Sequence, residues 1–258
     1  MRVAIHQPHY LPWLGLIDKI DRSDLVVVLD HVQYERQGWQ NRNYLASKNG
    51  PVLLTIPLIR GRSRDRISDK EIDNSSDWRE KHLRTLTEHC YGKAPFWPEF
   101  QEGIQRFYAT EWDRLVDVSL ASTRLVLDGF GIATPIVRAG ELGEFPGRKS
   151  ELLAQICAKV GATSLLCGGG ARHYIDRQVF RRYGVGLEWQ DFRHPHYAQT
   201  GRGSGDFLPR MAALDLLLNA GPGGVRLLRE ARDTGPAGPS ADSAAPSAGA
   251  GGSAASSG

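Results

Sequence analysis

Residues 3–43 constrain the fold of this chain more than any other stretch, because they read as a strand, a polar turn, a helix and a second strand. A short apolar run at 3–5 ends in a polar cluster at 6–10. Leu14, Ile17 and Ile20 then recur at helical spacing, after a proline that the first turn of a helix tolerates. The run LVVVLD at 25–30 is typical of a strand buried on both faces of a parallel sheet. The stretch therefore predicts a β-α-β unit.

Polar and aromatic side chains gather just past the ends of these two predicted strands. In a parallel sheet, ligands bind beyond the carboxyl ends of the strands. We interpret this group as a binding or catalytic site, although an Asn or Arg taken alone could equally tie down a long loop. Its members are His6, Gln7, Tyr10, Trp13, Asp30, Gln33, Tyr34, Trp39, Asn41, Arg42 and Asn43.

The composition excludes several classes of protein. A formal charge of +3, from 32 basic and 29 acidic residues, is not the clustered basic surface of a nucleic-acid binder. The densest basic stretch, RGRSRDR at 60–66, is interrupted by Asp65 and reads as a solvated loop. The chain starts almost at once with a strand, and no apolar run approaches the roughly 18 residues of a membrane span.

The three cysteines indicate neither a disulfide framework nor a metal site. Cys90, Cys157 and Cys167 are odd in number, widely separated and without a C-x-x-C pair. This usage fits a reducing cytoplasm, where we expect the protein to be located. His194 and His196 form another polar corner with Asp191, but two histidines alone do not predict a metal centre.

The rest of the chain continues the α/β alternation around a helical block. We expect a strand at 51–59, helices between about 75 and 130, strands at 135–142 and 185–192, a strand-glycine turn-helix unit at 163–184, and a closing helix near 207–224. The predicted fold is a Rossmann-like three-layer α/β domain, with a mostly parallel sheet and an inserted helical region. One domain is expected over 1–234, and the Gly/Ala/Ser/Pro segment 235–258 is expected to be disordered.

Two further segments could complete the site. Lys81 and His82 share one face of the predicted helix at 78–90, although simple packing and solvation explain that face equally well. Gly168 and Gly169 belong to a glycine turn that could bring backbone N–H groups onto an anion, with Arg172 and Tyr174 at the following helix start. The turn has the spacing of neither a dinucleotide fingerprint nor a phosphate loop, so a plain tight turn is an equal alternative.

A series of ordered motifs resembles the WbqC-like protein family from Met1 to about Gly224. The motifs are HQPHYLPWLGLIDKI, LDHVQY, WQNRNY, LTIPL, W-x-x-KH, YGKAPFW, TPIVRAGEL, GGGARHYID and WQDFRHPHY. At the glycine turn the family often has serine where this chain has Cys167. The resemblance implies a protein of a bacterial surface-polysaccharide or natural-product pathway, modifying amino sugars or other amines by acyl or aminoacyl transfer.

A more distant similarity is to nucleotidyltransferases with the HIGH motif and to pantoate ligases. It implies ATP as a candidate cofactor, although Trp13 and Gly15 stand where the second histidine of that motif would be useful. The ligase reading is therefore kept as an alternative, and so is a non-catalytic ligand-binding or scaffold protein in a biosynthetic complex. The expected partners are a small-molecule substrate and a carrier-protein thioester.

The hypothesis is transfer onto an amine or hydroxyl of a sugar or biosynthetic intermediate. His6 is the candidate general base, since an imidazole accepts a proton near neutral pH, and Asp30 would orient His6 or the nucleophile. Cys167 is the alternative, covalent nucleophile, because a helix amino terminus after its strand would stabilise a thiolate. Gln7, Asn41 and Asn43 would bind the acceptor or an oxyanion, and Arg42 or Arg172 would hold a phosphate or carboxylate.

Overall fold

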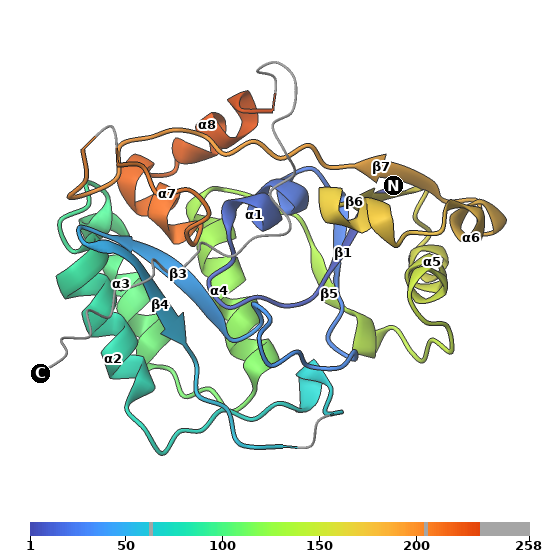
Figure 1. The fold of residues 1–258 in the computed structure, drawn as a ribbon, viewed down its shortest axis with the longest axis horizontal. Coiled ribbons are helices and arrows are strands. Elements are labelled where there is room, and N and C mark those ends of the chain that lie inside the picture. Colours follow the sequence, from blue (N-terminus) through green and yellow to red (C-terminus); the bar gives the residue numbers. More distant parts are fainter. Residues whose placement is uncertain (62–63, 204–205, 233–258) are drawn as a thin grey trace, which may run out of the picture.

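A five-stranded parallel sheet forms the centre of the computed structural model, which describes residues 1–61, 64–203 and 206–232. The strand order is β5-β2-β1-β6-β7 (Figure 1), which is the Rossmann order because the chain runs outward from β1 to one edge and then returns to the other side. Every pairing in this sheet is parallel. The strands are β1 (Arg2–His6), β2 (Leu25–Val28), β5 (Ile136–Arg138), β6 (Ser164–Cys167) and β7 (Gly186–Trp189).

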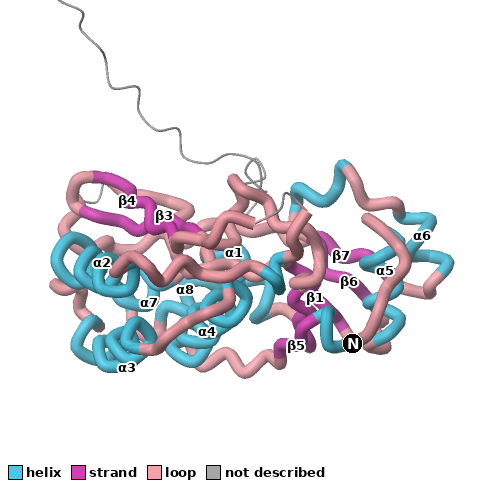
Figure 2. The backbone as a smooth tube through the Cα atoms, turned by 90° about the horizontal axis from the view of Figure 1, so that it is seen from below, coloured by secondary structure: helices cyan, strands magenta, loops and turns pink. Residues whose placement is uncertain are grey.

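Alternating side chains of β1 and β2 enter two separate cores, one on each face of the sheet. Ala4 and Val26 belong to the core on the side of α1 and α4, whereas Val3 and Val27 belong to the core under α5 and α6. Figures 1 and 2 show the sheet between these two sets of helices, so the fold has three layers, as predicted. The helices are α1 (Leu14–Asp21), α4 (Leu115–Gly129), α5 (Ser150–Lys159) and α6 (Arg177–Arg182).

The helices expected between 75 and 130 are present, and an antiparallel hairpin lies against them. The predicted helix at 78–90 is α2 (Trp78–Arg84) followed directly by a π-helix, η2 (Thr85–Tyr91), and α3 is Trp97–Ala109. The hairpin pairs β3 (Arg42–Ser47) with β4 (Gly50–Thr55). The closing helix is α7 (Leu214–Ala220), followed by α8 (Gly224–Glu230).

Four sequence-based expectations differ from the structure. The strand expected at 51–59 ends at Thr55 and pairs with β3, a strand the sequence did not reveal. The strand expected to reach Glu141 ends at Arg138, because a 3-10 turn, η3 (Ala139–Glu141), follows. The last strand ends at Trp189, before Asp191. The glycine turn leads into a 3-10 segment, η4 (Gly169–His173), and α6 begins only at Arg177.

Two expectations fall partly or wholly on residues outside the described ranges: the disordered segment 235–258, and the centre of the basic stretch at 62–63. Within the described ranges, no helix combines the length and the apolar character needed to cross a membrane.

Candidate functional site

A cavity of about 840 Å³ lies where the strand order reverses. β1 and β6 are neighbours in the sheet, but the chain leaves them toward opposite sides, so a crevice opens at their carboxyl ends. His6, the last residue of β1, and Cys167, the last residue of β6, both line the cavity. In open parallel α/β sheets, ligands generally bind at this position.

His6 presents a neutral imidazole to the cavity. Its Nδ1 lies 2.8 Å from the carbonyl oxygen of Gln7, and because a carbonyl only accepts, Nδ1 carries the proton. The lone pair therefore resides on Nε2. Burial, assisted by the positive charge of Lys19, lowers the pKa of His6 to about 4, so the ring is unprotonated at neutral pH.

A second histidine stands beside the first. The rings of His6 and His9 meet edge to face with centroids 4.6 Å apart. His9 is 8% exposed and lines the cavity, yet its buried Nδ1 has no hydrogen-bond partner. A buried polar nitrogen without a partner is costly unless a ligand or water supplies one. The wall continues with Gln7, whose Oε1 accepts a hydrogen bond of 2.6 Å from Nε2 of Gln40.

Three cationic residues line the cavity, against one carboxylate, Glu35. Lys19 comes from the interior of α1 and is only 7% exposed. Lys149 directly precedes α5, and Arg210 precedes Ala212, which bridges to Trp13. The backbone of both residues has a positive φ, 51° for Lys149 and 66° for Arg210, in a region that residues other than glycine rarely adopt. Strained backbone of this kind is typical of binding sites.

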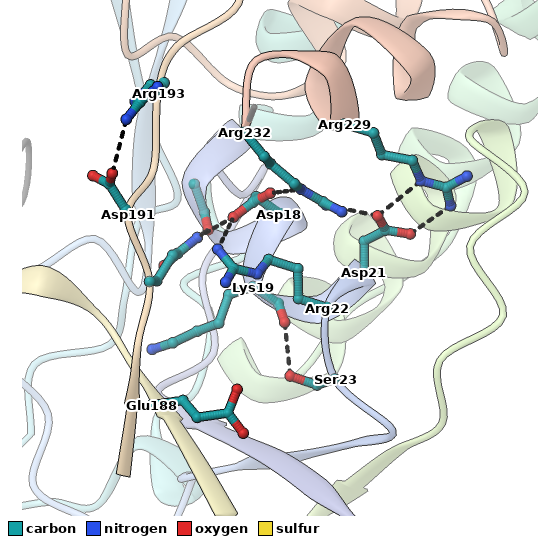
Figure 3. A network of polar contacts seen from close by, with 12 residues as sticks. Asp18, Lys19, Asp21, Arg22, Ser23, Glu188, Asp191, Arg193, Arg229 and Arg232 are labelled. Carbon is teal, nitrogen blue, oxygen red and sulfur yellow. Dashed lines mark hydrogen bonds and ion pairs between the residues drawn. The ribbon is translucent and has the colours of Figure 1, made fainter. Parts of the chain in front are cut away.

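The position of α1 is fixed by a buried network of polar contacts (Figure 3). Asp18 is 1% exposed and accepts hydrogen bonds of 2.6 Å from Gln190 and from Arg232, beyond the end of α8. Asp21 accepts a bidentate pair of bonds from Arg229. Figure 3 shows the Lys19 side chain extending away from these contacts. The network therefore holds the helix that supplies Lys19, and Gln190 also lines the cavity.

The structure brings eight of the predicted site residues to the cavity and leaves eleven outside its lining. Those in the lining are His6, Gln7, Trp13, Trp39, Asn43, Cys167, Gly168 and Tyr174. Those outside it are Tyr10, Asp30, Gln33, Tyr34, Asn41, Arg42, Lys81, His82, Gly169, Arg172 and Asp191.

Asp30 binds the edge of the sheet. Its Oδ2 accepts a 2.7 Å bond from Nε of Arg138, and its Oδ1 accepts a 3.0 Å bond from the backbone N–H of Gly140. A Cβ on Gly140 would approach Oδ1 to 3.3 Å, so the chain passes close to the carboxylate. Both carboxylate oxygens therefore accept hydrogen bonds from the segment that ends β5.

Several other predicted residues serve local structure. Tyr10 is fully buried, and its hydroxyl lies 2.9 Å from Nδ1 of His82 in the helical core. Asn41 donates to the carbonyl of Ile56 and accepts from the hydroxyl of Tyr34. These contacts fit the alternative in which such residues stabilise a long loop and the core.

The cations that the sequence suggested for anion binding lie elsewhere. Arg42 donates to the carbonyls of Gln37 and Gly38, which closes its own loop. Arg172 lies 4.7 Å from the ring centre of Trp189. Lys81 is exposed on α2, and Asp191 pairs with Arg193 at 3.2 Å. Gln33 forms a backbone bridge with Arg66.

Sequence reasoning missed Lys19, His9, Gln190, Lys149 and Arg210. Lys19 follows an apolar pattern that leaves it on the polar side of an ordinary amphipathic helix. In the fold, seven of the eight residues of α1 are buried, because segments from the far end of the chain cover the helix. No local signal reveals that covering. His9 belongs to the first polar cluster of the sequence, at 6–10, and this position close to His6 is a signal that could have identified it.

Cys167 is buried, and burial raises the pKa of its thiol to about 11. We therefore expect its alkylation by iodoacetamide at pH 7.5 to be at least ~100-fold slower than that of a free thiol, because the thiolate is the reactive form. The rate should rise about tenfold per pH unit toward pH 11. Peptide mass mapping measures this, with the urea-unfolded protein as the fast reference. Rapid modification of the folded protein at pH 7.5 would revive the covalent mechanism.

The described residues contain no group of three or more His, Cys, Asp or Glu side chains arranged to hold a metal ion. The polar groups in the cavity lining include two imidazoles, amides, a thiol, one carboxylate and cationic side chains. Such a set can accept a proton and bind an anion.

The fold is that of a Rossmann-like α/β protein, with a cavity that has cationic residues in its lining at the switch point of its sheet. The model of the WbqC-like protein family matches residues 7–227, and the chain belongs to this family. It is also similar to "Uncharacterized protein Rv1507c" of Mycobacterium tuberculosis, with 32% identity over 236 residues, covering 90% of this chain and 99% of the relative. No solved structure matches this chain.

Proposed function

We propose that the cavity is the active site of a biosynthetic transferase that moves an acyl or aminoacyl group onto an amine or hydroxyl of a sugar or natural-product intermediate. The observation that carries this proposal is His6. Its protonated Nδ1 is held by the carbonyl of Gln7, and the ring is neutral at physiological pH. The lone pair of Nε2 is then available to a nucleophile bound in the cavity.

In this reaction the acceptor nitrogen or oxygen attacks the carbonyl carbon of a thioester. Nε2 of His6 takes the proton that the nucleophile loses. The negative charge that develops on the carbonyl oxygen lies in the field of Lys19. Collapse of the tetrahedral intermediate breaks the carbon–sulfur bond, and the thiolate leaves with the proton from His6. A C–N or C–O bond has replaced the thioester, and His6 is neutral again.

The cationic lining favours one alternative, an ATP-dependent ligase that activates a carboxylic acid. Lys19, Lys149 and Arg210 would then contact the nucleotide phosphates. This route differs in its products, because it releases AMP or ADP. A binding or scaffold protein would use the same cavity without any product.

Mass spectrometry of reaction mixtures tests the proposal. The purified protein is incubated with acyl and aminoacyl thioesters of coenzyme A and of a carrier protein, each paired with nucleotide-linked amino sugars, with and without ATP. We expect an acceptor that gains the acyl mass and a stoichiometric free thiol, without ATP. A product that forms only with ATP, together with AMP or ADP, would replace transfer by ligation. Saturable binding without product in any combination would replace it by a binding function.

A further inference from the structure

We infer that the molecule bound in the cavity carries a diphosphate group, held by Lys19, Lys149 and Arg210. This inference rests on the proposed function and names the chemical class of its substrate. Two sources share this chemistry: a nucleoside diphosphate, including a nucleotide-linked sugar, and coenzyme A.

The charge of the lining is the first support. Among the described residues, the lining has two lysines and one arginine against one glutamate, which gives a formal net charge of +2. His6 adds nothing at neutral pH, because burial keeps it uncharged. A diphosphate carries two to three negative charges, and its oxygens accept several charge-assisted hydrogen bonds at once. A single carboxylate, with one negative charge and two oxygens, would match this lining less fully.

The burial of Lys19 is the second support. Its residue is only 7% exposed, and its positive charge contributes to the lowered pKa of His6 and His9. At Cys167 the same charge opposes the larger effect of burial, which raises the pKa of the thiol. The charge of Lys19 therefore acts on groups at the ends of both β1 and β6. In this desolvated place an anion gains far more than on an open surface.

The unpartnered nitrogen of His9 is the third support. Its Nδ1 is buried at the cavity wall without a hydrogen-bond partner. Burial lowers the pKa of this ring well below its usual value, so the ring is neutral and one of its nitrogens donates. In the tautomer with the proton on Nδ1, this nitrogen is a donor that a ligand oxygen in the cavity would satisfy.

The backbone conformation is the fourth support, because two of the cationic residues adopt an energetically unfavourable φ. Among the described residues other than glycine, three have a positive φ: Leu11, Lys149 and Arg210. Two of the three are cationic residues of the cavity lining. Such conformations persist where the surroundings impose them, typically at ligand sites.

The size and walls of the cavity indicate more than a bare diphosphate. A volume of about 840 Å³ is that of a site for a complete cofactor-sized molecule. Trp13, Trp39 and Tyr174 provide aromatic faces, and Leu152 and Leu153 provide an apolar wall. These surfaces suit the sugar, base or acyl chain that a diphosphate carries.

Isothermal titration calorimetry of the full chain tests the inference with pyrophosphate, inorganic phosphate, ADP, UDP and coenzyme A. We expect pyrophosphate to bind at least tenfold more tightly than phosphate. Tighter binding of ADP or UDP than of pyrophosphate would identify a nucleoside diphosphate, and tighter binding of coenzyme A than of ADP would identify the thioester carrier. Lys19→Met should weaken pyrophosphate binding at least tenfold, whereas Lys159→Met, on the exposed end of α5, should not.

A second variant, Lys149→Gly, keeps the test decisive if Lys19→Met fails to fold. Glycine relieves the positive φ, so the melting temperature should stay equal or rise while pyrophosphate binding weakens several-fold. Binding that neither variant weakens, or no diphosphate binding by the wild type, would overturn the inference. If no diphosphate binds but an acyl product still forms, the transferase survives and the diphosphate fails. If diphosphates bind through Lys19 and no product forms, the reverse holds.

Discussion

Replacing His6 by asparagine is expected to lower kcat for acyl transfer by about 10²- to 10⁴-fold, the usual contribution of a general base. The amide of asparagine can still donate to the carbonyl of Gln7, as Nδ1 does now at 2.8 Å, but it offers no basic nitrogen in place of Nε2. The substitution therefore removes the proton acceptor and keeps the turn. KM should change little, because substrate contacts from the cations remain.

Steady-state kinetics by product mass measures this effect. The matched control is His89→Asn, on the exposed side of the π-helix η2, which should retain wild-type turnover. In the wild type, kcat/KM should stay level through neutral pH and fall only toward pH 4, since the pKa of His6 in the folded protein without substrate is about 4. A kcat within threefold of the wild type for the asparagine variant would remove His6 from the mechanism.

Mild acid is expected to destabilise the folded chain strongly. Burial lowers the pKa of His6, His82 and His194 to about 4, whereas in the unfolded chain such groups titrate near 6.5. Between the native pKa of about 4 and the unfolded pKa of about 6.5, the unfolded state binds protons that the native state does not bind. Stability is therefore lost as the pH falls from 6.5 toward 4. The loss on going from pH 7.5 to pH 5 is about 2 kcal/mol for each histidine, and about 6 kcal/mol for the three.

Urea unfolding at the two pH values measures this loss. Asp215 acts in the opposite direction, because burial raises the pKa of its carboxyl and protonation then favours the native state. His82→Gln should reduce the loss of stability between pH 7.5 and pH 5 by about 2 kcal/mol, whereas the exposed His89→Gln should leave it unchanged. Equal unfolding free energies at pH 7.5 and pH 5 would show that these rings are not buried in the neutral form.

The sequence was most informative where a structural element is local. The β-α-β unit, the helices between 75 and 130 and the closing helix all carry their own hydrophobic periodicity, and each is present. The strand β3 was hidden because its first residues are polar and looked functional. Asn43 donates to the carbonyl of Leu11 and pairs across the hairpin with Leu54, so it also ties the hairpin to the first turn.

The candidate site divides in the same way. His6, Gln7 and Cys167 could be predicted because any residue that ends a parallel strand lies at the ligand-binding edge. Lys19 and Gln190 could not, because their burial depends on contacts with segments far along the chain. Asp30 also follows a strand, but its carboxylate accepts hydrogen bonds from Arg138 and Gly140, at the end of the neighbouring strand β5, which no local pattern indicates.

The network behind α1 has a consequence for the order in which this molecule is made. Asp18 is bonded to Gln190, 172 positions later, and to Arg232, 214 positions later. β1 also leaves the ribosome long before β6, its partner on one side. Long-range contacts of this kind slow folding and leave partly built sheets exposed during synthesis. The nascent chain therefore completes its cavity only after Gln190 and Arg210 have been translated.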